Sequence, residues 1–226
     1  MSLPYLSFPE KVAIVGPPPG KTNLVFQILL NQISEFDVVL VFGFMEYRRF
    51  LKNYGFISYH MQSYNPCDFA EKMIVLMDEV DPQLHSNIIE NSGILDRFEQ
   101  CFKEGKKCLL IMDGPGGEEG FWGKLPDGNY SYIGINLLFD YTSDCQMFIK
   151  SICDSGKDRF WNFRFADKIF FPCDGGHVYE NRVADLKMMG CDESDLKRLV
   201  MLDIKRDHFI DFYELRSKKC FRVDYF

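Results

Sequence analysis

Residues 14–23, IVGPPPGKTN, contain the residue types that bind phosphate groups. A glycine turn that leads into a helix directs backbone N–H groups and the positive end of the helix dipole at an anion. Lys21 adds a mobile positive charge, and the Thr22 hydroxyl is placed to bind Mg²⁺. The pattern predicts a site for ATP and Mg²⁺, in which the other binding residues are Gly16, Gly20 and Asn23.

This segment departs from the phosphate-loop consensus G-x-x-x-x-G-K-[ST]. Gly16 and Gly20 enclose three residues instead of four, and all three are proline. Pro19 stands directly before the Gly-Lys pair and has no N–H group to donate to a phosphate. Two interpretations therefore remain: a shortened phosphate loop, or a proline-stiffened turn that ends in Gly-Lys-Thr by chance.

A second candidate metal ligand ends the apolar segment CLLIMD, residues 108–113. An acid at the end of a buried strand holds Mg²⁺ in phosphate-loop ATPases, and Asp113 has this position. Hydrolysing enzymes of this type place a second acid next to it, but Gly114 follows here. Glu118 or Glu119 could orient the attacking water instead, or both could belong to a solvated charged loop.

The elements that would position these residues follow a β-α-β order. Residues 11–15 and 37–43 are short apolar runs that indicate buried strands, and residues 21–36 have apolar positions at helical spacing. Further strands are expected at 56–60, 106–114, 131–141 and 166–172, and helices at 45–55, 66–80, 82–105, 143–157, 178–190 and 193–202. The last residues, 208–226, favour two strands around a polar turn.

This alternation predicts one α/β domain spanning residues 1–226 with a mainly parallel sheet. An insertion loop is expected at about 114–130, and the C-terminal helices and strand pair at about 178–226. Eight cysteines without a C-x-x-C pair indicate reduced thiols in a reducing compartment. The sequence has no apolar run long enough for a membrane span and no secretion signal.

The net charge of −7 and the pI of about 5.2 count against a broad nucleic-acid-binding face. Any contact with DNA must come from a local basic site. Arg48, Arg49 and Lys52 form the best such cluster in the sequence, although a solvated helix face has the same pattern.

Taken together, these segments resemble the genome-packaging ATPases of large eukaryotic DNA viruses, the poxvirus-type branch of the FtsK/HerA motors. VAIVGPPPGKTNLV is similar to the family's phosphate loop, GKKCLLIMDG to its magnesium-binding strand and INLLFDYT to its sensor strand. FWNFRFADKIFFP is similar to the arginine and strand that follow, and the C-terminal segment to the family's closing strand pair.

The resemblance implies a P-loop NTPase-like, three-layer domain that hydrolyses ATP with Mg²⁺ and moves viral DNA into a capsid. It implies Asp140 or Thr142 at the sensor position, where the family usually has glutamine. It also implies Arg164, or else Arg159, as a finger that acts on a neighbour's nucleotide. The implied partners are double-stranded DNA, capsid or portal-vertex proteins and further copies in a homo-oligomeric ring, with no membrane. The implied location is the virion or a viral assembly site in the host cytoplasm.

Two other functions remain open. All departures from the motifs fall on catalytic positions, which would suit a degenerate, non-hydrolysing homologue that acts as a structural or interaction subunit. A small-molecule or nucleoside kinase would also use a phosphate loop, with KDRFWNFR as its only candidate lid.

Overall fold

The computed structural model describes the core of the domain. The described residues are 6–14, 20–43, 45–60, 72–76, 91–114, 128–136, 167–173, 186–187, 191–202, 209–214 and 219–224.

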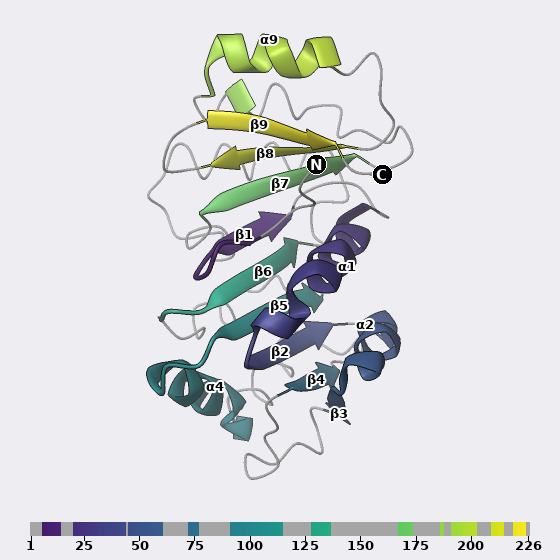
Figure 1. Ribbon diagram of the computed structural model, residues 1–226, viewed down its shortest axis with the longest axis vertical. Coiled ribbons are helices and arrows are strands. Elements are labelled where there is room, and N and C mark those ends of the chain that lie inside the picture. The colour runs from purple at the N-terminus through teal and green to yellow at the C-terminus, as the bar shows by residue number, and fades with distance from the viewer. Residues whose placement is uncertain are drawn as a thin grey trace.

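Nine strands among these residues form one sheet in the order β3-β4-β2-β5-β6-β1-β7-β8-β9 (Figure 1). The strands are β1 Lys11–Ile14, β2 Val38–Gly43, β3 Ile57–His60, β4 Lys72–Leu76, β5 Cys108–Gly114, β6 Ser131–Asn136, β7 Lys168–Cys173, β8 Phe209–Glu214 and β9 Lys219–Asp224. All neighbours from β3 to β7 are parallel, whereas β7, β8 and β9 pair antiparallel. The predicted α/β fold with a mainly parallel sheet and a C-terminal strand pair is confirmed.

The helices lie on both faces of this sheet, which gives the three layers. They are α1 Gly20–Gln32, α2 Met45–Leu51, α4 Ile94–Lys103 and α9 Glu193–Leu202, with short 3-10 helices η1 Ile33–Glu35 and η2 Lys52–Tyr54. The helices expected near 21–36, 45–55, 82–105 and 193–202 are confirmed within the described residues.

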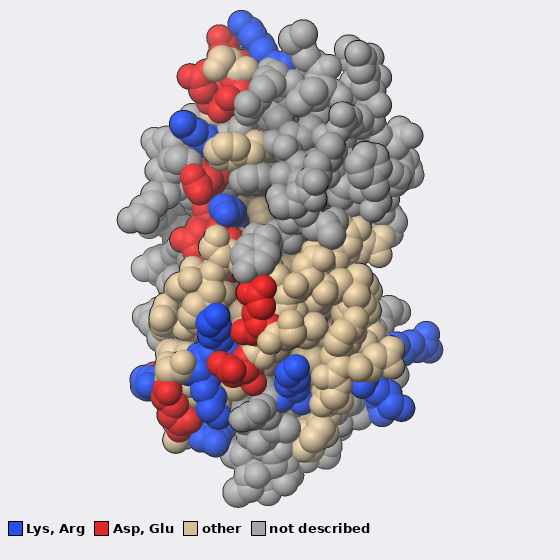
Figure 2. Space-filling model, in the orientation of Figure 1, with Lys and Arg blue, Asp and Glu red and all other residues tan. Residues whose placement is uncertain are grey.

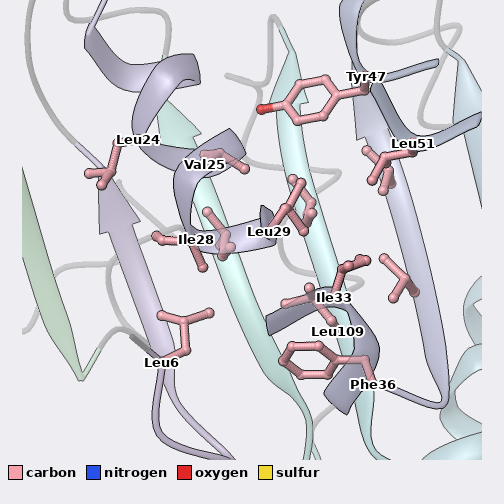
Figure 3. Close-up of a cluster of buried hydrophobic side chains, with 14 of the residues drawn as sticks. Leu6, Leu24, Val25, Ile28, Leu29, Ile33, Phe36, Tyr47, Leu51 and Leu109 are labelled. Atoms are coloured by element: carbon pink, nitrogen blue, oxygen red, sulfur yellow. The ribbon is translucent and has the colours of Figure 1, made fainter. Parts of the chain in front are cut away.

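Helix α1 covers one face of the sheet because its apolar positions recur at helical spacing. Leu24, Val25, Ile28 and Leu29 are all buried in one cluster with alternate residues of the central strands (Figure 3). The cluster also contains Tyr47 and Leu51 of α2.

Helix α4 covers the other face. Its buried residues Ile94, Phe98 and Cys101 share a second cluster with Leu40 of β2 and Leu110 of β5. Leu109 and Ile111 of β5 belong to the α1 cluster instead. Residues of β5 therefore alternate between two buried faces, which is why its sequence is an uninterrupted apolar run.

The helix expected over residues 66–80 is wrong at its centre, where the chain forms strand β4. β4 lies between β2 and β3 and is parallel to both. Met73 and Ile74 are buried in opposite clusters, so both faces of this strand are covered. A short apolar segment of this kind has no alternation that separates a doubly buried strand from a helix.

The expectation of reduced thiols is met at two cysteines and is wrong at a third. Cys101 and Cys108 are buried thiols that form no disulfide bond. Cys191, which is also buried, takes part in a disulfide bond. Scattered positions in the sequence did not indicate it, because the fold decides which sulfur atoms meet.

Several predicted segments lie outside the described residues. They are most of the loop at 114–130, the helix at 143–157 and most of the helix at 178–190.

Candidate functional site

The buried lysine of the phosphate-loop pattern is held at the start of α1. Gly20 is the first residue of the helix, and the Lys21 side chain is only 2% exposed. Lysine is rarely buried this deeply in proteins. The first turn of α1 contains no acidic residue. The positive end of this helix dipole favours a negatively charged ligand, and Lys21 places a second positive charge in the same turn.

The packing of α1 fixes this turn relative to the sheet. Leu24 and Ile28 are fully buried in the same cluster as Ile14 of β1, Ile133 of β6 and Phe170 of β7. α1 thus lies over the strand that precedes it in sequence and over both neighbours of that strand. Figure 1 shows α1 running back across the sheet from the edge at which the parallel strands end.

Asp113 lies at this same edge of the sheet. Ile14, the last residue of β1, is in register with Ile135 of β6, and Ile135 is in register with Asp113 of β5. One strand therefore separates β1 from β5. At about 4.8 Å per strand spacing, the backbone of Asp113 lies roughly 10 Å from that of Ile14. Ligands of parallel α/β sheets bind at the carboxyl ends of the strands.

The strand between them has an unusual packing arrangement on its α4 face. The Tyr132 ring lies over Gly134, where an added Cβ would be 2.6 Å from the Tyr132 hydroxyl oxygen. Gly134 is in register with Ala13 and Met112, one residue before the Ile14–Asp113 row. Glycine at this position is therefore required by a close approach rather than by a turn. Sequence reasoning missed this pair, although the G in the apolar run YIGI was a signal.

The hydroxyl group of Tyr132 is buried and has no hydrogen-bond partner among the residues that the structure describes. Burial, and then the nearby Tyr130, raise the pKa of Tyr132 well above its ordinary value. The group therefore stays neutral on the α4 face of β6, and its unpaired oxygen destabilises the fold.

Helix α2 also starts at this edge. Phe42 of β2 is in register with Met112 of β5, and α2 begins at Met45, just after β2 ends. The sheet therefore brings three features to the edge at which its parallel strands end: the first turn of α1, the first turn of α2 and the end of β5.

The remaining candidate residues differ in how far the structure places them. Asn23 is exposed in the first turn of α1. For Thr22 and Asp113 the backbone is placed, in α1 and β5 respectively. The other candidates, Gly16, Glu118, Asp140, Arg159 and Arg164, lie outside the described residues.

The described residues contain no cluster of three or more histidine, cysteine, aspartate or glutamate side chains that could hold a metal ion unaided. Mg²⁺ does not require one, since one or two protein ligands and the phosphates of a nucleotide commonly complete its coordination. Thr22 and Asp113 are the donor types that this arrangement uses. None of the described helices is long and apolar enough to cross a lipid bilayer.

Comparison with known proteins gives matches to solved structures only. No family model matches the chain, and no curated protein matches it. The genome packaging NTPase B204 from Sulfolobus turreted icosahedral virus 2 in complex with sulfate superposes with a TM-score of 0.57 at 10% identity, covering 98% of both chains. Its complex with ATP-gammaS gives 0.53 at 10% identity, over 97% of this chain and 98% of that one.

B204, the DNA-packaging ATPase from Sulfolobus turreted icosahedral virus, gives a TM-score of 0.50 at 11% identity. The match covers 97% of this chain and all of the other, 100%. At these identities the likeness shows the fold. It spans nearly the whole of both proteins, and the fold it shows resembles that of a P-loop packaging NTPase.

Proposed function

We propose that this chain is an ATPase subunit of a motor that packages viral DNA. It would bind ATP at the start of α1 and use Mg²⁺ in hydrolysis. The observation that carries the proposal is the buried Lys21 in the first turn of α1, at the sheet edge where β5 ends and Asp113 is its second-to-last residue.

In this proposal, the N–H groups of Gly20, Lys21, Thr22 and Asn23 donate to the phosphates, and Gly16 shapes the turn before them. The Lys21 ammonium group neutralises the outer phosphates. Pro19 removes one donor that a full-length loop would offer, so the lysine and the helix dipole supply a larger share of the binding free energy.

The Thr22 hydroxyl and the Asp113 carboxylate would hold Mg²⁺, which stabilises negative charge on the transferred phosphoryl group. Asp113 is two residues beyond Ile111, which faces α1. Strand alternation assigns position 113 to the same face of β5 as Ile111. Glu118 would orient the attacking water, and Asp140 would contact the nucleotide from the segment after β6.

The motor function is supported by the likeness to genome-packaging and DNA-packaging NTPases over the length of the chain. We expect subunits to form a ring in which Arg164 reaches a neighbour's nucleotide. Double-stranded DNA and capsid or portal-vertex proteins would be the partners, in the virion or at an assembly site in the host cytoplasm.

Binding of a fluorescent ATP analogue tests the first step. Lys21→Met keeps the aliphatic stem and removes the charge, so we expect the Kd to rise at least tenfold. Lys103→Met, on the exposed side of α4, is the matched control and should leave the Kd unchanged. Equal affinity of the wild type and Lys21→Met would refute the proposed nucleotide site.

A degenerate, non-hydrolysing subunit is the second candidate, favoured by Gly114 at the position after Asp113. Phosphate release with and without double-stranded DNA separates the two. The motor predicts DNA-stimulated hydrolysis that Asp113→Asn abolishes while nucleotide binding without metal persists. Tight binding with no turnover under any condition would establish the second candidate.

A further inference from the structure

We propose that one exposed face of α2 and η2 binds the phosphate backbone of double-stranded DNA. This surface, called the α2 basic face below, consists of Arg48, Arg49 and Lys52. The inference rests on the proposed function for its choice of partner. It adds which part of the subunit contacts the DNA.

The three cations lie together because α2 and η2 form one continuous helical segment. Leu51, where they join, has α-helical angles of φ −79° and ψ −19°. Arg48 and Lys52 are four residues apart and therefore adjacent on the helix surface, with Arg49 beside them. All three are exposed. Gly55, in the left-handed conformation with φ 81°, ends the segment, and its N–H donates to the Lys52 carbonyl oxygen at 3.3 Å.

The opposite side of this segment fixes it to the domain. Tyr47 and Leu51 are fully buried in the core cluster that contains α1. Phe50 stacks on Phe26 of α1, with 4.7 Å between the ring centroids. The α2 basic face therefore belongs to a packed helical element, so binding a phosphate backbone there does not require the protein backbone to become ordered.

Among the described residues, the α2 basic face has no acidic partner. None of its three residues forms an ion pair among the part of the chain that the structure describes, whereas the exposed Lys103 pairs with Glu99 and Lys187 with Glu193. In a chain with a net charge of −7, these three neighbouring cations have no ion pair with any residue that the structure describes. Figure 2 shows blue side chains projecting from the margin of the molecule where α2 lies.

The chemistry of these residues matches a phosphate backbone. Arginine presents several donors in a planar fork that can bind two phosphate oxygens at once, and lysine adds a point charge. A row of phosphates offers acceptors to all three residues together. The face lies on the helix that starts beside the end of β5, so DNA held there would lie near the nucleotide without occupying its site.

The test is fluorescence anisotropy of a labelled DNA duplex over a series of salt concentrations. The variant Arg48→Gln, Arg49→Gln, Lys52→Gln removes three charges. Lys103→Gln, Lys187→Gln, Lys197→Gln removes three exposed charges from α4, from residue 187 and from α9, and is the matched control. Each phosphate contact contributes about 0.9 to the slope of log K against log salt concentration.

We expect the first variant to bind the duplex at least tenfold more weakly and to lower that slope by about 2 to 3. The control should change neither quantity by a comparable amount, and ATP-analogue binding should be unaffected in both. Equal losses of duplex affinity in the two variants would overturn the inference. So would a competition experiment in which polyglutamate displaces the labelled duplex as well as unlabelled duplex of the same total charge does. Thermal melts confirm that each variant is folded, and Arg48→Gln, Arg49→Gln replaces the triple variant if it is not.

This test and that of the proposed function fail separately. A wild-type protein that binds ATP but no duplex would overturn the α2 basic face and leave the nucleotide site standing. A protein that binds the duplex through this face but no ATP would support the inference and refute the ATPase.

Discussion

The ring of Phe26 in α1 stacks on the ring of Phe50 in α2 at a centroid distance of 4.7 Å and an interplanar angle of 20°. The edge of Tyr47 meets the same Phe26 ring at 5.0 Å and 64°. Phe26 therefore joins the helix that begins with Lys21 to the helix that carries the α2 basic face. A displacement of either helix must be accommodated by the other, since close-packed side chains do not deform freely.

Phe26→Leu should destabilise the protein because it removes both aromatic contacts while keeping an apolar side chain. We expect the free energy of unfolding to fall by about 1 to 2 kcal/mol in urea titrations. Leu30→Ala is a control on the same helix, where the side chain is 55% exposed and the expected change is within about 0.5 kcal/mol. If Leu30→Ala lowers the free energy of unfolding as much as Phe26→Leu does, the aromatic contacts of Phe26 make no specific contribution to stability.

Tyr132→Phe should leave the protein as stable as the wild type or stabilise it. The substitution removes a buried hydroxyl group that has no hydrogen-bond partner and keeps the ring that fills the space. We expect a gain of up to about 1 kcal/mol in the free energy of unfolding. A loss of more than this in chemical denaturation would show that the hydroxyl has a partner after all.

Gly134→Ala should destabilise the protein even when the Tyr132 hydroxyl is absent. The added Cβ would lie 2.6 Å from the hydroxyl oxygen but also 2.8 Å and 2.9 Å from ring carbons, which Phe would retain. We expect a cost of about 1 to 3 kcal/mol in both the wild type and the Tyr132→Phe background. Equal stability of Gly134→Ala and wild type would show that the Tyr132 ring can move away.

Strong local patterns made much of the fold predictable from sequence. The spacing of Leu24, Val25, Ile28 and Leu29 predicted both α1 and its buried face, and the structure confirms it. The segment at 72–76 had no such pattern. Because β4 is buried on both faces, its apolar residues do not alternate, and only the pairing with β2 and β3 determines that it is a strand.

The candidate site was predictable in residue type but not in arrangement. Sequence motifs selected Lys21 and Asp113, but the intervening strand β6 and the register that links Ile14 to Asp113 are properties of the sheet. The Tyr132–Gly134 contact depends on how one side chain lies along its own strand. The disulfide bond of Cys191 likewise depends on which segments the fold brings together.

The Cys108 thiol should make the fold less stable at alkaline pH. Burial, aided by Cys101 and Asp37, raises its pKa from 9.0 to about 12. Above pH 9 the unfolded chain loses this proton while the folded protein keeps it, so the free energy of unfolding falls with rising pH up to about pH 12. The slope approaches about 1.4 kcal/mol per pH unit.

Cys108→Ala removes the pH dependence that this thiol contributes. The amount by which the variant is less stable than the wild type at pH 8 should therefore shrink as the pH rises to 10.5. Urea titrations of both proteins at a series of pH values give the difference between their free energies of unfolding. In this difference, the contributions of the titrating groups that both proteins share cancel. Parallel curves for the two proteins would contradict the raised pKa. The same protonated thiol should resist alkylation in the native state at pH 8 and react once the protein is unfolded.

Asp192 should stabilise α9 in a way that acid removes. Its carboxylate accepts hydrogen bonds from the Ser194 hydroxyl at 2.6 Å and from the Ser194 N–H at 2.7 Å, directly before the helix begins. These bonds, the hydroxyl first, hold the pKa of Asp192 below its usual 3.8. The stabilisation is therefore present above pH 3.8 and is lost as the pH falls through the lower, folded-state pKa.

At pH 6 we expect Asp192→Ala to lower the Tm by about 2 °C. Near pH 2 the Tm difference between Asp192→Ala and the wild type should shrink. Asp192→Asn keeps a hydrogen-bond acceptor without a charge, so its Tm should differ from that of Asp192→Ala by the same amount at both pH values. A deficit of Asp192→Ala that is equal at pH 6 and pH 2 would mean that the carboxylate charge does not stabilise the start of α9.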